Sequence, residues 1–173
     1  MVLSMNTVPA TPDSFTIERT ENPTSSERIA EILTSPGFGN YFTDHMVVID
    51  WNESAGWHNA RVQPYQNFQM DPASMVFHYG QAIFEGIKAY RQQDDSVVTF
   101  RPDQNAARMQ SSAQRLAMPE LPEELFIESL RQLVEIDKQW VPAAGGEESL
   151  YLRPFMISTQ VSLGVHPANA YTF

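Results

Sequence analysis

The side chains that most often do chemistry are scattered along this sequence. The four histidines are His45, His58, His78 and His166, and none has a second histidine four residues away, as a helical zinc site requires. The chain has no cysteine, which excludes disulfides and thiolate metal sites. Lone histidines are more often hydrogen-bonded structural residues than ligands. The sequence therefore predicts no metal site.

Paired carboxylates offer little more. They occur at Asp94-Asp95, Glu123-Glu124 and Glu147-Glu148, in predicted loops or helix starts, where turn chemistry and solvation account for acidic residues. General acid–base work is therefore not expected of them. The sequence also lacks the glycine patterns of dinucleotide-binding folds, P-loops and nucleophile elbows.

Arginines and aromatic residues in unusual strings remain as candidates. A guanidinium such as that of Arg108 binds phosphate through a planar, charge-assisted fork. Position alone also fits a solvated helix arginine, as we expect for Arg115 one heptad later. Arg153 lies in the apolar run 150–157, and a buried guanidinium would need a partner there. Tyr151 and the other aromatic residues could line an apolar pocket or simply pack in the core.

The sequence of the first half of the chain predicts an irregular arm, a helix and a β-hairpin. Residues 1–24 are rich in Pro, Thr, Ser and Asn and predict an irregular arm. A capping box over Thr24–Glu27 then starts a helix that ends before Pro36. A hairpin follows, with strands over 45–51 and 61–68 around a loop over 53–60.

A proline marks the second of these strands. Pro64 cannot donate a ladder hydrogen bond, so it predicts an edge position or a bulge. A short helix is expected before a second hairpin, whose strands are 87–91 and 97–101. Pro102 then suits the first turn of a helix with a stripe of apolar residues.

The last third predicts a second long helix and two strands. Pro119 and Pro122 separate the two helices, and the second runs to about Val141. After a flexible Gly-Gly loop come a strand over 150–157 and the start of another at 170–173. Hairpins imply antiparallel pairing, and the two principal helices must cover one face of the sheet. The sequence thus predicts an α+β, two-layer domain.

Composition narrows the class of protein further. The 173 residues are 42% hydrophobic and carry a formal net charge of −10. This charge argues against nucleic acid or an anionic membrane as a partner, since both need a basic surface. We find no signal peptide and no apolar run of membrane-spanning length. A soluble protein is expected, and the lack of cysteine fits a cytoplasmic one.

Five longer strings give a specific resemblance. They are Phe38–Met46, Phe77–Tyr90, Phe100–Pro102 with Arg108-Met109, Ser149–Pro154 and Ser162–Val165. In order and spacing they resemble the branched-chain amino acid aminotransferases, pyridoxal-phosphate enzymes of the fold type shared with D-amino acid aminotransferase and aminodeoxychorismate lyase. The resemblance covers most of the chain, from about residue 38 to residue 165.

The resemblance implies a two-domain subunit in a homodimer, with pyridoxal 5'-phosphate in the cleft between the domains. Residues 25–173 would be the N-terminal small domain, ending just before the interdomain linker. The abrupt apolar ending at Phe173 agrees with a chain that is one part of a larger enzyme. The parent enzyme would transfer the amino group of leucine, isoleucine or valine to 2-oxoglutarate.

The resemblance also implies roles for single residues. Arg108 matches the arginine that contacts the cofactor's phosphate. Residues that match the substrate pocket are Phe38, Tyr79, Phe84, Tyr151 and Arg153. Tyr79 and Val165 match positions that reach into the neighbouring subunit's site. Gly86 is expected to be structural, permitting a tight entry into its strand.

The lysine that the family chemistry requires is not expected in this chain. Its two lysines are Lys88, where the family does not place the Schiff-base lysine, and Lys138, near the end of a helix. We therefore predict no catalytic residue here and no transaminase activity of this polypeptide alone. The alternatives are D-amino acid aminotransferase or aminodeoxychorismate lyase specificity, or a stand-alone domain without catalysis.

Overall fold

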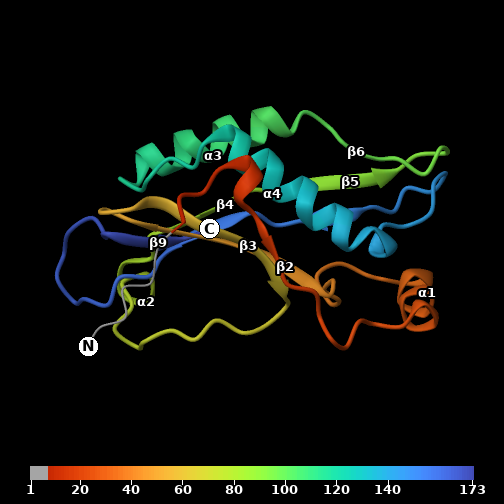
Figure 1. The fold of residues 1–173 in the computed structure, drawn as a ribbon, viewed down its shortest axis with the longest axis horizontal. Helices are drawn as coiled ribbons and strands as arrows, with labels where there is room; N and C mark the ends of the chain where they lie inside the picture. The colour runs from red at the N-terminus through yellow and green to blue at the C-terminus, as the bar shows by residue number, and fades with distance from the viewer. Residues whose placement is uncertain (1–7) are drawn as a thin grey trace.

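The computed structural model describes residues 8–173 as strands in two sheets covered on one side by two long helices (Figure 1). The larger sheet has the strand order β1-β3-β2-β9-β8-β4, and the smaller has the order β6-β5-β7. All pairs are antiparallel except β1 with β3. The predicted α+β, two-layer class with a mainly antiparallel sheet is confirmed.

The strands have the following bounds: β1 Thr16–Ile17, β2 His45–Asn52, β3 Gly56–Pro64, β4 Ala82–Phe84, β5 Ile87–Arg91, β6 Val97–Thr99, β7 Leu150–Leu152, β8 Phe155–Ser158 and β9 Ala170–Thr172. The helices are α1 Ser26–Thr34, α2 Val76–Tyr79, α3 Pro102–Arg115 and α4 Glu123–Ile136, with short 3-10 turns at Pro12–Ser14 and Lys138–Trp140. The arm before α1 is therefore partly ordered over residues 8–24, and residues 1–7 lie outside the description.

Local signals place the helices well. The predicted capping box over Thr24–Glu27 is wrong by one residue: Ser25 is the N-cap and accepts a hydrogen bond from the Arg28 backbone N–H, whereas the Thr24 hydroxyl donates to Asp44. The helix α1 ends at Thr34, before Pro36 as expected. Pro102 occupies the first turn of α3, as expected. The second long helix ends earlier than predicted: α4 stops at Ile136, and a 3-10 turn continues to Trp140.

Two strand predictions are wrong in their bounds. The first hairpin is tighter than expected, because β3 begins at Gly56 and ends at Pro64 rather than covering 61–68. The run 150–157 is two strands, since the chain turns from β7 to β8 at Arg153-Pro154 and changes sheets there. Apolar character continues across this break, so hydropathy alone cannot show it.

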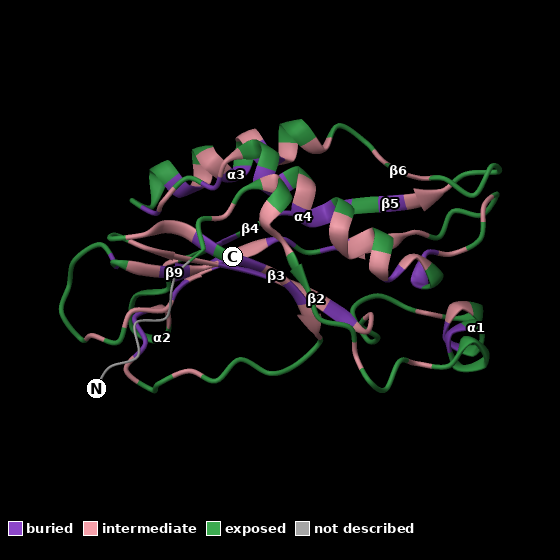
Figure 2. Ribbon diagram, in the orientation of Figure 1, coloured by how far each residue is buried: buried purple, intermediate pink, exposed green. Residues whose placement is uncertain are grey.

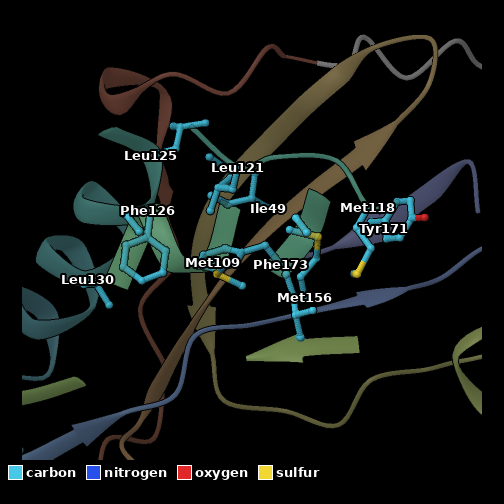
Figure 3. Packing of buried hydrophobic residues seen from close by; sticks show 14 of the residues in the cluster. Ile49, Met109, Met118, Leu121, Leu125, Phe126, Leu130, Met156, Tyr171 and Phe173 are labelled. Carbon is cyan, nitrogen blue, oxygen red and sulfur yellow. The ribbon is translucent and has the colours of Figure 1, made fainter. Parts of the chain in front are cut away.

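The main core lies between the larger sheet and the helices α3 and α4 (Figures 2 and 3). Figure 3 shows Phe126 and Leu130 of α4 and Met109 of α3 facing Ile49 of β2 and Met156 of β8. All five are buried, and each such side chain contributes roughly 1.5–3 kcal/mol through transfer from water. Among residues 8–173, no helix is long and apolar enough to cross a membrane.

Candidate functional site

The site is organised around the three residues Phe84-Glu85-Gly86, where the chain passes from one sheet to the other. β4 ends at Phe84 and pairs with β8 in the larger sheet, whereas β5 begins one residue after Gly86 and pairs with β7 in the smaller. The Glu85 backbone N–H donates to the Pro154 carbonyl oxygen at 2.8 Å. Pro154 lies between β7 and β8, where the chain also passes from one sheet to the other. This hydrogen bond therefore joins the two places at which the chain changes sheets.

Three predicted pocket residues meet beside this crossing. The Arg153 guanidinium lies 4.6 Å from the centre of the Phe84 ring, and its Nη2 donates to the Tyr151 hydroxyl at 2.9 Å. Arg153 is exposed, so the apolar run 150–157 does not bury its guanidinium. Its partners are instead an aromatic face and a phenol at the surface.

Phe38 joins this group from the loop after α1. Its ring meets the Tyr151 ring edge to face at 5.0 Å between centres. Phe38, Tyr151 and Arg153 all line a hollow of about 820 Å³ whose walls are largely aromatic and aliphatic. Phe38 is 70% exposed and Phe84 is 65% exposed, so neither ring is an ordinary core residue. The core alternative considered for these two aromatic residues is thus excluded by their exposure.

Gly86 has a specific steric role beside Tyr151. A Cβ placed on Gly86 would lie 2.3 Å from the Tyr151 hydroxyl oxygen, well inside van der Waals contact. A side chain at this position would therefore displace the Tyr151 phenol from its place beside the strand entry. This explains the expected structural role of Gly86 through packing of a pocket residue against the strand entry.

Arg108 is held by a carboxylate that the sequence reasoning did not single out. Its Nε and Nη2 donate to the two Glu85 carboxylate oxygens at 2.8 and 2.6 Å. The Asn105 amide, one helical turn earlier on α3, donates to the same carboxylate at 2.8 Å. The Arg108 side chain is 68% exposed, whereas Glu85 is only 3% exposed. The only feature of the sequence that pointed to Glu85 is its place as an acidic residue within a largely apolar stretch, Ile83–Ile87.

The electrostatics of this pair favour both charged forms. Burial raises the pKa of the Glu85 carboxyl, but hydrogen bonds from Arg108 and Asn105 and the arginine's charge outweigh it, so the net pKa is lowered. The Arg108 pKa is raised by its hydrogen bonds to Glu85. The described residues give Arg108 Nη1 no hydrogen-bond partner, which leaves one edge of the guanidinium open.

Tyr79 and Val165 form a second group around α2 and the loop before β9. The Tyr79 hydroxyl donates to the Leu163 carbonyl oxygen at 2.5 Å, which ties α2 to this loop. Val165 is 85% exposed, and Phe77 and Val161 are exposed nearby in the sequence. The seven predicted site residues thus fall into two places in this chain: Tyr79 and Val165 here, and the other five around Phe84–Gly86.

The two lysines and the histidines have other surroundings. Lys138 Nζ pairs with Asp95 at 2.6 Å on the surface, and Lys88 is exposed on β5. His45 is buried, donating from Nδ1 to Asp137 at 2.7 Å while its Nε2 accepts the Thr20 backbone N–H at 3.0 Å. Because Nε2 is an acceptor, the imidazole carries its proton on Nδ1. His45 is thus a hydrogen-bonded structural residue, as histidines of this kind were expected to be.

The fold defines the class of protein to which this chain is similar. It matches the branched-chain aminotransferase of Thermoproteus uzoniensis with norvaline at a TM-score of 0.52 and 25% identity, covering 74% of this chain and 39% of that one. A second branched-chain amino acid aminotransferase, solved with pyridoxamine 5'-phosphate, gives a TM-score of 0.51 at 25% identity, covering 72% and 38%. The Escherichia coli enzyme, at 20% identity and a TM-score of 0.55, shows the same fold.

Curated relatives agree at the level of sequence. The chain is 60% identical over 162 residues to the branched-chain-amino-acid aminotransferase of Mycolicibacterium smegmatis, covering 94% of this chain and 44% of the relative. A probable enzyme of this name from Streptomyces coelicolor is 56% identical over 94% of this chain and 45% of the relative. No protein-family model matches. The resemblance read from the sequence is confirmed, and the chain spans less than half the length of these relatives.

Proposed function

We propose that this chain is the small, pocket-forming domain of a pyridoxal-phosphate-dependent branched-chain amino acid aminotransferase. The complete protein would transfer the amino group of leucine, isoleucine or valine to 2-oxoglutarate, giving a branched 2-oxo acid and glutamate. The observation that carries this proposal is the 60% identity over 94% of the chain to an enzyme of that name. A cytoplasmic location, expected from the cysteine-free sequence, is part of the proposal.

The residues around Arg108 fit the cofactor's phosphate. The guanidinium is mostly exposed, its Nη1 has no partner among the described residues, and a buried carboxylate holds its other edge. An edge with free N–H groups is what a pair of phosphate oxygens requires. The bound cofactor supplies the electron sink for amino-group transfer, and Arg108 of this chain would bind and orient it.

The residues beside this arginine fit an aliphatic substrate. Phe38 and Phe84 present exposed rings, and an aromatic wall excludes water from a branched side chain without needing polar partners. The Tyr151 hydroxyl and the Arg153 guanidinium add polar groups at the same place. They would orient the carboxylate that every amino acid substrate carries.

A homodimer is the proposed assembly. Val165 and Tyr79 lie on exposed structure of α2 and the loop before β9 and would serve the pocket of a neighbouring subunit. Exposed apolar side chains gather in the same segments, which favours association over a solvated surface. The exposed large apolar residues of these segments are Phe77, Val161, Leu163 and Val165.

This polypeptide alone is proposed to lack transaminase activity, since neither lysine suits the Schiff-base role. Lys138 is committed to a surface ion pair with Asp95. Borohydride reduction of the 173-residue chain with pyridoxal 5'-phosphate, followed by peptide mapping, tests this claim. Stoichiometric labelling of Lys88 or Lys138 would refute it. The complete protein should instead be labelled at a lysine outside this chain.

Substrate specificity is tested by comparing amino donors with the complete protein. We expect activity with L-leucine and 2-oxoglutarate and none with D-alanine. Activity with D-alanine, or release of pyruvate from aminodeoxychorismate, would favour the related enzymes of the same fold. A coding sequence that stops after Phe173 would favour the stand-alone domain without catalysis.

A further inference from the structure

Two arginines of this chain make almost the same contacts with a glutamate. Arg108 donates from Nε and Nη2 to Glu85 at 2.8 and 2.6 Å, and Arg131 donates from the same two atoms to Glu128 at 2.8 and 2.6 Å. A neighbouring amide supports each carboxylate, that of Asn105 on Glu85 and that of Gln132 on Glu128. The local chemistry of the two pairs is therefore matched.

The two pairs differ in the third nitrogen of the guanidinium. Nη1 of Arg131 donates to Glu135 at 2.7 Å, so carboxylates occupy both edges of that arginine. Nη1 of Arg108 has no such partner among residues 8–173. A guanidinium has two bidentate edges, and of these two arginines only Arg108 keeps one edge free.

The carboxylate that holds Arg108 is itself fixed from several directions. Glu85 is 3% exposed, and its backbone N–H is bonded to Pro154 where the sheets cross. Asn105 binds both the Glu85 carboxylate and the Gly86 carbonyl oxygen, at 2.8 and 3.3 Å. Phe84 and Gly86, on either side of Glu85, contact the pocket residues Arg153 and Tyr151. The position of Arg108 is thus tied to the strand that carries the pocket wall.

We infer that Glu85 is a positioning residue for the cofactor's phosphate. It grips the Nε–Nη2 edge of Arg108 so that the Nη1–Nη2 edge is held ready for phosphate oxygens, in fixed relation to the pocket beside Phe84. This inference rests on the proposed function, in which Arg108 contacts that phosphate. Glu85 itself touches neither cofactor nor substrate, and it acts through the orientation of Arg108.

The experiment measures binding of pyridoxal 5'-phosphate and of pyridoxal, which lacks the phosphate, by equilibrium dialysis against the cofactor-free complete protein. The variants are Arg108→Met, Glu85→Gln and, as the matched control, Glu128→Gln. In Glu85→Gln an NH₂ group replaces one of the two acceptor oxygens, so Arg108 loses one of its two hydrogen bonds to this side chain. We expect Arg108→Met and Glu85→Gln each to weaken the phosphate-bearing probe about tenfold and to leave pyridoxal unchanged. Glu128→Gln should change neither affinity.

The outcomes separate this inference from the proposal beneath it. If Arg108→Met weakens the phosphate-bearing probe selectively and Glu85→Gln binds like Glu128→Gln, the positioning role is overturned while the phosphate contact stands. If Arg108→Met has no selective effect, the phosphate contact itself fails, and the positioning role fails with it. Equal losses for both probes in Glu85→Gln would assign Glu85 a merely structural role and overturn the inference.

A second variant covers the case in which Glu85→Gln does not fold. Glu85→Asp keeps the buried charge and both oxygens but withdraws them by one methylene, about 1.5 Å. Arg108 would follow its partner inward, and binding of the phosphate-bearing probe should fall selectively, by less than in Arg108→Met. Wild-type binding of both probes by Glu85→Asp would overturn the positioning role.

Discussion

The Arg108–Glu85 and Arg131–Glu128 pairs share their geometry and differ in their surroundings. Arg131 and Glu128 are three residues apart on one helix, with the arginine 56% exposed and the glutamate 15% exposed. Glu85 is 23 residues from Arg108 and joins a sheet crossing to α3, and it is only 3% exposed. The same pair of arginine–glutamate hydrogen bonds can therefore lie along one helix or connect a helix to a sheet.

This difference indicates that burial of the carboxylate decides how much such a pair contributes to the free energy of unfolding. A carboxylate on the solvent-facing side of one helix, such as Glu128, loses less when its partner is removed, because water reaches the site and replaces the hydrogen bonds. Removing a buried carboxylate leaves its hydrogen-bond donors unpaired, and removing the partner of a buried carboxylate leaves an uncompensated charge in the interior. The following changes test this ranking, beginning with a carboxylate that is buried more deeply than either glutamate.

Asp137→Ala should have the largest effect on stability. Asp137 is 0% exposed and accepts both the His45 backbone N–H at 2.9 Å and the His45 Nδ1–H at 2.7 Å. Its loss leaves two buried donors unpaired, which should lower the free energy of unfolding by about 3 kcal/mol. Urea denaturation of the variant measures this, and a loss no larger than that of Glu128→Ala would break the ranking.

Glu85→Ala should come second. The change removes the acceptors of Arg108 and Asn105 together, at the crossing between the sheets. We expect the free energy of unfolding to fall by about 2 kcal/mol, since part of the exposed guanidinium can rehydrate. The double variant Glu85→Ala with Arg108→Ala isolates the pairwise contribution in a double-mutant cycle. Additive single effects would show that the pair contributes nothing.

Acidification should erase the difference between Glu85 and its neutral substitute. The folded pKa of Glu85 is lowered by Arg108 and Asn105 against the opposing effect of burial, so its stabilisation is fully present above the unfolded pKa of about 4.3. It is lost as the pH falls through the lower folded pKa. The stability deficit of Glu85→Gln should thus be constant from about pH 7 to about pH 5 and shrink below about pH 4. A deficit that grows on acidification would contradict this sign.

Glu128→Ala should have the smallest effect, about 0.5 kcal/mol or less in the free energy of unfolding. Arg131 keeps its second partner, Glu135, and remains mostly exposed. Salt should reduce even this difference, because exposed charges are screened. Measuring Glu128→Ala and Glu85→Ala at low and high salt sharpens the comparison, since the Glu85 deficit should persist in salt.

Much of the fold was accessible from the sequence where its signals are local. The existence of α1, Pro102 at the start of α3 and the hairpin of β5 with β6 each depend on residues within one turn or one loop. The capping residue of α1 was predicted one position too early, because the Thr24 hydroxyl binds Asp44 of a distant segment. Short strands were less accessible. β4 was not predicted at all, because its three residues gain their conformation only by pairing with β8.

Some residues of the candidate site could likewise be recognised from the sequence, and others only from the structure. Arg108 and the pocket aromatic residues were recognised because their strings resemble a known family. Glu85 was not singled out, since an acid in an apolar string has no visible partner until α3 packs against β4. The sequence also left the exposure of Arg153 open, because hydropathy does not show the change of sheet at Pro154.

The sequence by itself determined the kinds of element in this chain, its two-layer class and its resemblance to branched-chain aminotransferases. These follow from the periodicity, caps and strings of neighbouring residues. Only the tertiary structure decided that Glu85 holds one edge of Arg108, that Gly86 makes room for the Tyr151 phenol, and that the Tyr79 hydroxyl binds the loop that carries Val165. Those arrangements depend on where two sheets cross and which helix covers them, and such pairings join residues far apart in the chain.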